Sequence, residues 1–152
     1  EEAFSMPKRD GVNGVVVSTK PLSLNGQLVE NFKITFKDGK VVSVIAKKGQ
    51  DILEKLIFET EGAGYLGEVA LVQNDSPISN TGLVFNTTLF DENASCHLAL
   101  GRALGPTKGL EDLLNESSIH IDFMMGTADM SIDGLTQDNK WIPIFRNGDF
   151  VI

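Results

Sequence analysis

The sequence predicts an α+β domain built mainly from antiparallel sheet, barrel-like or strongly curved, with two or three helices. Three observations support this class. Residues 28–36 alternate apolar and polar side chains, as a half-buried strand does. The turn signal Asp38-Gly39 joins them to a β-branched run at 41–46, which predicts a hairpin. Asp-Gly and Asn-Gly turns recur toward the end of the chain, where they would join further short strands.

The first half of the chain is predicted to hold one helix among its strands. The segment 50–60 is the helix, because its apolar side chains, Leu53 and Ile57 among them, fall on one helical face. The stretch 74–81 is rich in turn residues. The strands expected in this half are 12–19, 28–36, 41–46 and 68–72.

The second half is predicted to contain two helices. The first runs from Asp91 to about Leu104, with Asp91 as its N-cap and Gly105-Pro106 as its end. A short second helix covers 110–114. The strands expected here are a brief one at 83–85, then 119–123, 130–132 and 141–152.

Composition and charge exclude several classes of protein. A length of 152 residues with 41% apolar and 22% charged residues indicates one compact globular domain. The net charge of -8 argues against a nucleic-acid surface, and no apolar run reaches the roughly 20 residues of a membrane helix. The single cysteine, Cys96, excludes an internal disulfide and is compatible with the cytosol. Because the chain opens on Glu1-Glu2-Ala3-Phe4 without a methionine, we expect it to be part of a longer protein.

The two histidines lie among residues that a divalent metal ion could use. In a strand over 119–123, His120 and Asp122 share one face, which supplies an imidazole and a carboxylate side by side. His97 would project from the helix that begins at Asp91. Glu68 begins an apolar strand, where an unpaired carboxylate would be costly to bury. Glu1 and Glu2 add two further carboxylates.

Each of these residues also has a structural interpretation. A single histidine is more often hydrogen-bonded or solvated than a ligand, and Glu68 could cap a turn or pair with lysine. Cys96 next to His97 could indicate a thiol nucleophile, but neighbours in a helix point about 100° apart, so Cys96 is interpreted as a small buried residue. The glycines of 61–67 precede a strand and lack a following Gly-Lys-Ser/Thr, which argues against a phosphate loop.

Longer segments give a more specific indication than spacing. Residues 62–72, 89–101 and 118–124 closely resemble the aminopeptidase T/aminopeptidase S family of bacterial metallo-aminopeptidases, which are of leucyl type. The opening Glu1-Glu2-Ala3-Phe4 and the closing segment 144–150 are also similar to that family. The resemblance implies that residues 1–152 are a single C-terminal metal-binding domain, which an α/β domain precedes in the full protein.

The resemblance also implies a set of site residues and a reaction. The metal ligands map onto Glu68, His97, His120 and Asp122, with Glu2, or alternatively Glu1, as a further glutamate. Two divalent ions (zinc, cobalt, manganese or magnesium) would activate a water that removes the N-terminal residue of a peptide, with Glu68 or Glu2 as bridging carboxylate or general base. The full protein would be a cytoplasmic homodimer.

One position departs from the family pattern, and one rival function stays open. The family has a functional tyrosine seven residues after the histidine, where this chain has Leu104. The only tyrosine, Tyr65, lies in another segment. The rival is a non-catalytic β-rich domain for dimerisation or ligand binding, with a structural or vestigial metal site.

Overall fold

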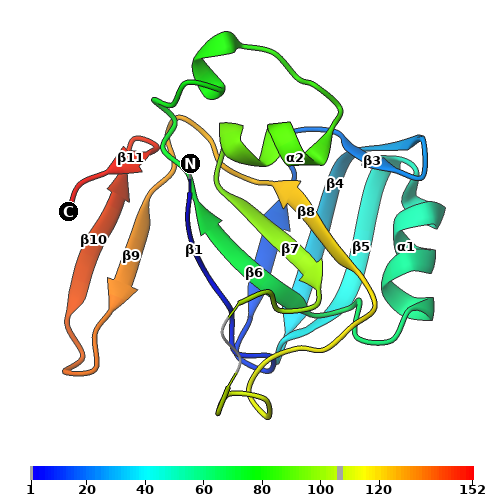
Figure 1. The fold of residues 1–152 in the computed structure, drawn as a ribbon, viewed down its shortest axis with the longest axis horizontal. Helices are drawn as coiled ribbons and strands as arrows, with labels where there is room; N and C mark the ends of the chain where they lie inside the picture. The colour runs from blue at the N-terminus through cyan, green and yellow to red at the C-terminus, as the bar shows by residue number, and fades with distance from the viewer. Residues whose placement is uncertain (1, 106–107) are drawn as a thin grey trace.

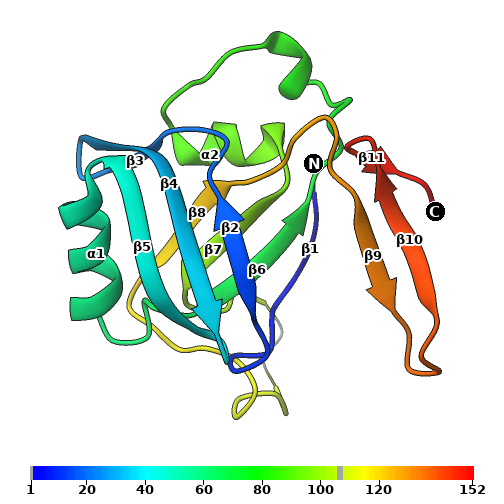
Figure 2. The ribbon, with the colours of Figure 1, turned by 180° about the vertical axis from the view of Figure 1, so that it is seen from behind.

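The computed structural model describes residues 2–105 and 108–152 and shows antiparallel sheets with helices at their margins (Figures 1 and 2). The helices are α1 (Gln50–Glu59) and α2 (Thr88–Asp91), with two 3₁₀ turns, η1 (Ser79–Thr81) and η2 (Glu92–Ala94). The strands are β1 (Ala3–Ser5), β2 (Gly14–Val17), β3 (Leu22–Leu24), β4 (Gln27–Lys37), β5 (Lys40–Lys48), β6 (Leu66–Leu71), β7 (His97–Gly101), β8 (His120–Met124), β9 (Ile132–Leu135), β10 (Trp141–Arg146) and β11 (Asp149–Phe150).

The first sheet is organised around the long strand β4. It has the order β2-β4-β3, and β5 also pairs with β4 as the second arm of a hairpin. The hairpin turn places Asp38 and Gly39 at positive φ, which explains the Asp-Gly pair. At Gly39 a Cβ would lie 1.8 Å from the Arg9 carbonyl oxygen, so the turn requires glycine for space as well. Helix α1 packs against β5 and β4.

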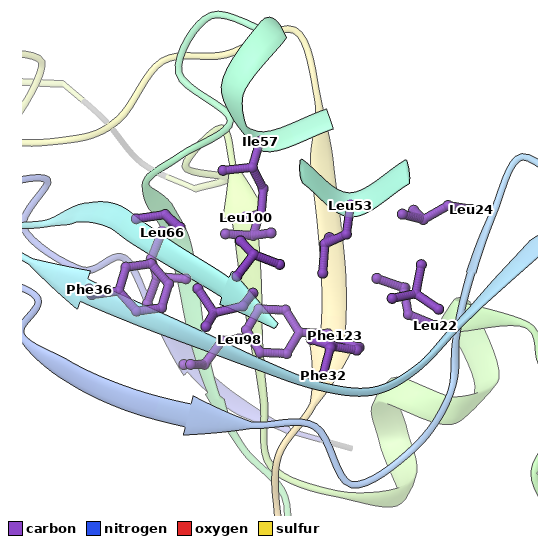
Figure 3. Packing of buried hydrophobic residues seen from close by; sticks show 14 residues of the cluster. Leu22, Leu24, Phe32, Phe36, Leu53, Ile57, Leu66, Leu98, Leu100 and Phe123 are labelled. Carbon is purple, nitrogen blue, oxygen red and sulfur yellow. The ribbon is translucent and has the colours of Figure 1, made fainter. Parts of the chain in front are cut away.

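The second sheet has the order β1-β6-β7-β8, with every pair antiparallel. One of its faces meets the first sheet and α1 in the main core. Figure 3 shows Leu98, Leu100 and Phe123 of this face next to Phe32 of β4 and Leu53 of α1. The Phe32 and Phe123 rings lie 5.5 Å apart, and all five side chains are buried. Each such side chain contributes about 1.5–3 kcal/mol by leaving water, so this core holds the second sheet in place.

A third, small sheet of order β11-β10-β9 projects beside β1 (Figures 1 and 2). Asn147 and Gly148 form the turn between β10 and β11, both at positive φ. Phe145 is buried and packs edge-on against Phe150. The Asn74 N–H donates to the Gly148 carbonyl, which links this sheet to the segment after β6.

The α+β class with dominant antiparallel sheet is confirmed. The described strands form three open sheets, and no closed barrel is present among them. The helix at 50–60 and the strands at 28–36, 41–46, 68–72 and 119–123 lie within two residues of their predicted bounds. None of the described helices has the length and apolar character needed to cross a membrane.

The predicted helix from Asp91 to Leu104 is wrong. It is replaced by α2, η2 and the strand β7. Helical spacing fits this segment by coincidence, because leucines alternate with alanine and glycine and Leu98 and Leu100 point into the core. Pairing with a strand on each side then decides the conformation, since β7 is buried along its whole length. Asp91 ends α2, and its carboxylate accepts N–H groups of the preceding turn.

Smaller predictions also need correction. Residues 83–85 are irregular chain, and 110–114 form a turn instead of a helix. The final strand at 141–152 is interrupted by the Asn147-Gly148 turn, and 130–132 is replaced by β9 two residues later. Pro106, the predicted helix end, lies outside the described residues.

Candidate metal centre

The second sheet brings the predicted ligands together on the face opposite to the main core. Strand pairing sets Glu68 of β6 opposite Ala99 of β7, which in turn is opposite Asp122 of β8. Residues directly opposite one another share a face, so Glu68 and Asp122 lie on the same side. His97 lies two residues before Ala99 on β7, and His120 lies two residues before Asp122 on β8, so both histidines point to this same side. On β6 and β7 the neighbouring residues of this face are small, namely Ala70, Ala99 and Gly101, which leaves room over these two strands.

A β-bulge at Gly67 turns Glu68 to this face. The register between β6 and β7 shifts between Leu66 and Glu68, so Leu66 points into the core while Glu68, two residues later, points away from it. The bulge needs glycine, because a Cβ at Gly67 would lie 2.2 Å from the Arg102 carbonyl oxygen. The sequence therefore places a glycine directly before Glu68 for a geometric reason.

His97 forms one half of the cluster with two glutamates. Its Nε2 lies 3.1 Å from Glu2 Oε2 and 3.5 Å from Glu68 Oε1. Its Nδ1 lies 3.1 Å from the Ser95 carbonyl oxygen, which can only accept, so Nδ1 carries the hydrogen of this contact. The histidine is 1% exposed. Glu2 reaches it from the residue before β1, which pairs with β6.

His120 forms the other half with Asp122 and the same Glu68. Its Nε2 lies 3.2 Å from Asp122 Oδ1 and 3.7 Å from Glu68 Oε2. Its Nδ1 lies 2.7 Å from the Arg102 carbonyl oxygen, the same oxygen that approaches Gly67. The bulge that turns Glu68 and the contact that orients His120 are therefore built on one backbone group.

The donor atoms of both halves fit a bound cation. In each half, the three ligand atoms lie within 4.8 Å of one another, and Glu68 belongs to both. Each imidazole uses Nδ1 on a backbone carbonyl and so directs its Nε2 lone pair at carboxylate oxygens. Lone pairs facing carboxylates repel unless a proton or a metal ion lies between them. Histidine held by its second nitrogen is also the usual arrangement around a protein-bound metal.

The charges of the cluster point in the same direction. Burial raises the pKa of Glu68, and the nearby Asp122 carboxylate raises it further. The hydrogen bond to Asp122 raises the pKa of His120. Raised pKa values of a carboxylate and of the neighbouring imidazole are the mark of a site short of positive charge. A divalent ion would supply that charge.

Glu92 is a further acidic residue of the centre that the sequence did not indicate. It lies in η2, and burial followed by the Asp122 charge raises its pKa to about 7. Glu2, Glu68 and His97 also act on it, so it lies close to both halves of the cluster. Its local sequence contains no ligand pattern. The sequence offers only its position five residues before His97, and the short turn η2 between them brings Glu92 to the same centre.

The other residues that the sequence singled out have the following surroundings. The Cys96 thiol is buried and contacts the backbone of Val72, as expected for a structural residue, and burial raises the pKa of this thiol. Tyr65 packs against the Arg9 guanidinium. Leu104 follows β7 in irregular chain and is 38% exposed. Glu1 lies outside the described residues, so only Glu2 can be placed near the centre.

Comparison with known proteins supplies the family. Residues 1–150 match the family model described as thermophilic metalloprotease (M29). The chain belongs to this family. A metalloprotease family implies a divalent metal cofactor, in agreement with the donor set described above. The resemblance to aminopeptidases T and S is thereby confirmed.

Individual relatives agree with this assignment. The chain is 54% identical to the aminopeptidase AmpS of Bacillus subtilis (strain 168), over 99% of its length. It is 47% identical to aminopeptidase T of Thermus aquaticus over 100% of its length. The solved structure of wild-type AmpT from Thermus thermophilus matches the whole chain with a TM-score of 0.92 at 45% identity. The chain spans 39% of the length of these two curated relatives and 40% of the solved chain.

Proposed function

We propose that this chain carries the metal centre of an aminopeptidase that removes the N-terminal residue of peptides with a metal-activated water. The observation that carries the proposal is the position of Glu68, whose two carboxylate oxygens face the Nε2 atoms of His97 and His120. A carboxylate shared in this way is suited to bridge two cations. The M29 family membership and the aminopeptidase names of the relatives support the same activity.

The residues divide into two ligand sets around Glu68. Glu2 and His97 would hold one ion, and His120 and Asp122 would hold the other. When bound, such a pair of ions lowers the pKa of a water and polarises the carbonyl of the bond to be cleaved. The ions are zinc, cobalt, manganese or magnesium, and the mixed nitrogen and oxygen donors suit the first three best. Glu68 and Glu2 remain the proposed catalytic carboxylates, as bridge or as base.

Glu92 extends this set. In the metal-free chain burial keeps its pKa near 7, in the range that suits a residue accepting and releasing a proton at neutral pH. We propose that it completes the coordination of an ion or receives the proton of the attacking water. The expected homodimer and the expected cytoplasmic location belong to the full protein and remain predictions.

The function is tested by metal content together with turnover. After dialysis against zinc or cobalt, wild type is expected to retain two ions per chain and to hydrolyse leucyl-p-nitroanilide. His120→Ala and Glu68→Gln should each lower the rate at least about 100-fold, since each removes a side chain proposed to bind an ion directly. Glu61→Gln, an exposed glutamate in the turn before β6, is the matched control and should behave as wild type.

Two results would support the non-catalytic rival instead. One is bound metal without turnover at any metal concentration, and the other is turnover that neither substitution changes. Leu104→Tyr tests the departure from the family pattern. A large gain in rate in this variant would show that position 104 limits the reaction.

A further inference from the structure

The outer edge of β8, next to the metal centre, carries no strand partner. In the described part of the chain β8 is the last strand of its sheet. The Arg102 N–H donates to Ile119, and the Met125 N–H donates to Cys96, so odd-numbered residues of β8 bond to β7. The backbone groups of antiparallel strands alternate, and those of His120 and Asp122 therefore point outward.

One outward-facing group on this edge already accepts a backbone hydrogen bond. The Thr19 N–H donates to the Met124 carbonyl over 2.9 Å. Met124 has the same parity as Asp122 and His120, so it belongs to the same outward row. Of the outward backbone groups of β8, the Met124 carbonyl is therefore hydrogen-bonded, while those of His120 and Asp122 face the open edge.

A groove runs along the open part of this edge. Beside His120 and Asp122 it has a volume of about 380 Å³, with β3, α2 and Glu92 as its other walls. It continues past Ile119 into a second hollow of about 590 Å³ against α1. Leu24, Asn25 and Ile121 line both hollows, so the two adjoin. An added strand would pair about 4.8 Å from β8, on the side that these hollows border.

The position of the metal centre gives the groove a direction. The end beside α2 holds Glu92 and Asp122, both acidic and both next to the metal cluster. With two divalent ions bound these carboxylates are neutralised, so the direction follows from the reaction, because an aminopeptidase must hold the first residue of its substrate at the metal centre. The other end, beside α1, is lined by none of the proposed metal ligands. An extended peptide with its N-terminus at the metal centre would therefore run from Asp122 toward Ile119, antiparallel to β8.

From these observations we propose that the peptide substrate binds as an added antiparallel strand on the edge of β8. This inference rests on the proposed aminopeptidase function. One substrate residue pairs with Asp122 through both its N–H and its C=O, and the residue two positions further along pairs with His120. The residues that carry the metal ligands thus also hold the substrate backbone, which aligns the bond to be cleaved with the centre. Backbone pairing does not depend on side chains, so the enzyme accepts varied sequences after the first residue.

The substrate side of the pairing is tested with N-methylated peptides. The probe is a leucine-initiated pentapeptide whose first amide is replaced by a CH₂–NH linkage, so that it is not cleaved. A methyl group is placed on each later backbone nitrogen in turn, and inhibition of leucyl-p-nitroanilide hydrolysis is measured. We expect a loss of affinity of about ten-fold or more at alternate nitrogens only, because outward groups of a strand recur every second residue. Equal effects at all positions would overturn the proposal.

The protein side is tested by amide hydrogen exchange in the 152-residue chain. The unmethylated probe should slow exchange at His120 and Asp122 and leave Ile121 and Phe123, which β7 already engages, unchanged. Unchanged exchange at His120 and Asp122 under saturating probe would overturn the proposal, whether or not the chain hydrolyses anything. Hydrolysis of leucyl-p-nitroanilide with a flat methyl scan would remove the strand pairing alone. Failure to bind metal would remove the proposed function.

Discussion

At the scale of single residues, the centre is an excess of carboxylates around two imidazoles, and this determines how it responds to pH. Burial raises the pKa of Glu68, and it raises the pKa of Glu92 to about 7. An acid whose pKa is higher in the folded chain than in the unfolded one binds its proton more tightly when folded. Its contribution to stability is therefore present at low pH and is lost as the pH rises through the folded value.

Glu92→Gln tests this directly in the metal-free chain. From about pH 4.5 to about pH 7 the wild type should lose stability that the glutamine variant keeps, since glutamine does not ionise. The difference is on the order of 1 kcal/mol, because partial exposure of Glu92 screens its charge. Urea unfolding in EDTA at pH 5 and pH 8 measures it, with Glu59→Gln as the exposed control. A difference between variant and wild type that does not change with pH would contradict the account.

Metal binding should show the opposite dependence on pH. Carboxylates that hold protons must release them before they can bind an ion, so protons compete with metal at low pH. We expect zinc to raise the melting temperature more at pH 8 than at pH 5. Thermal unfolding with and without zinc at the two pH values measures this. An equal rise at both values would mean that the buried carboxylates do not bind the ion.

The sequence predicted those parts of the site that depend on residue spacing within a single element. His120 and Asp122 were placed correctly on one strand face because a period of two needs only one strand. His97 was assigned to the wrong element, yet it reaches the centre because it begins β7, which pairs with β6 and brings it next to Glu68. Glu92 could not be found from spacing, since its proximity to Asp122 arises from the packing of η2 against β8. Contacts between distant segments do not leave a pattern in one sequence.

At the scale of elements, the bulge in β6 is the feature on which both stability and metal binding depend most. Gly67→Ala would drive a Cβ to within 2.2 Å of the Arg102 carbonyl oxygen, so β6 or β7 must move. We expect a loss of stability of about 3 kcal/mol, as for overpacking of a rigid site. Because Arg102 also holds His120, metal affinity should fall together with stability. Denaturant unfolding and zinc titration measure the two effects.

Gly64→Ala is the matched control for this substitution. A Cβ at Gly64 meets its nearest neighbour at 3.5 Å, which is ordinary van der Waals contact. This variant should keep metal affinity and most of its stability. Equal losses in the two variants would show that the bulge has no special role in turning Glu68.

At the scale of the whole molecule, the proposed ions join segments that are far apart in the sequence. Glu2 reaches the cluster from next to β1, a strand of three residues on the edge of its sheet. So short a strand gains little from its own pairing, and the ion would hold it in place. Amide hydrogen exchange of β1 should slow on addition of zinc, whereas the buried strand β7 should change little. Exchange of β1 that is unaffected by zinc would contradict a role for Glu2.

The central claim is that two cations share Glu68, and anomalous diffraction from crystals soaked with zinc tests it most directly. Two anomalous peaks are predicted, one beside His97 and Glu2 and one beside His120 and Asp122, with the Glu68 carboxylate between them. The Glu68→Gln variant should lose at least one peak. The absence of peaks at these histidines in wild type, or a single peak that does not contact Glu68, would contradict the account.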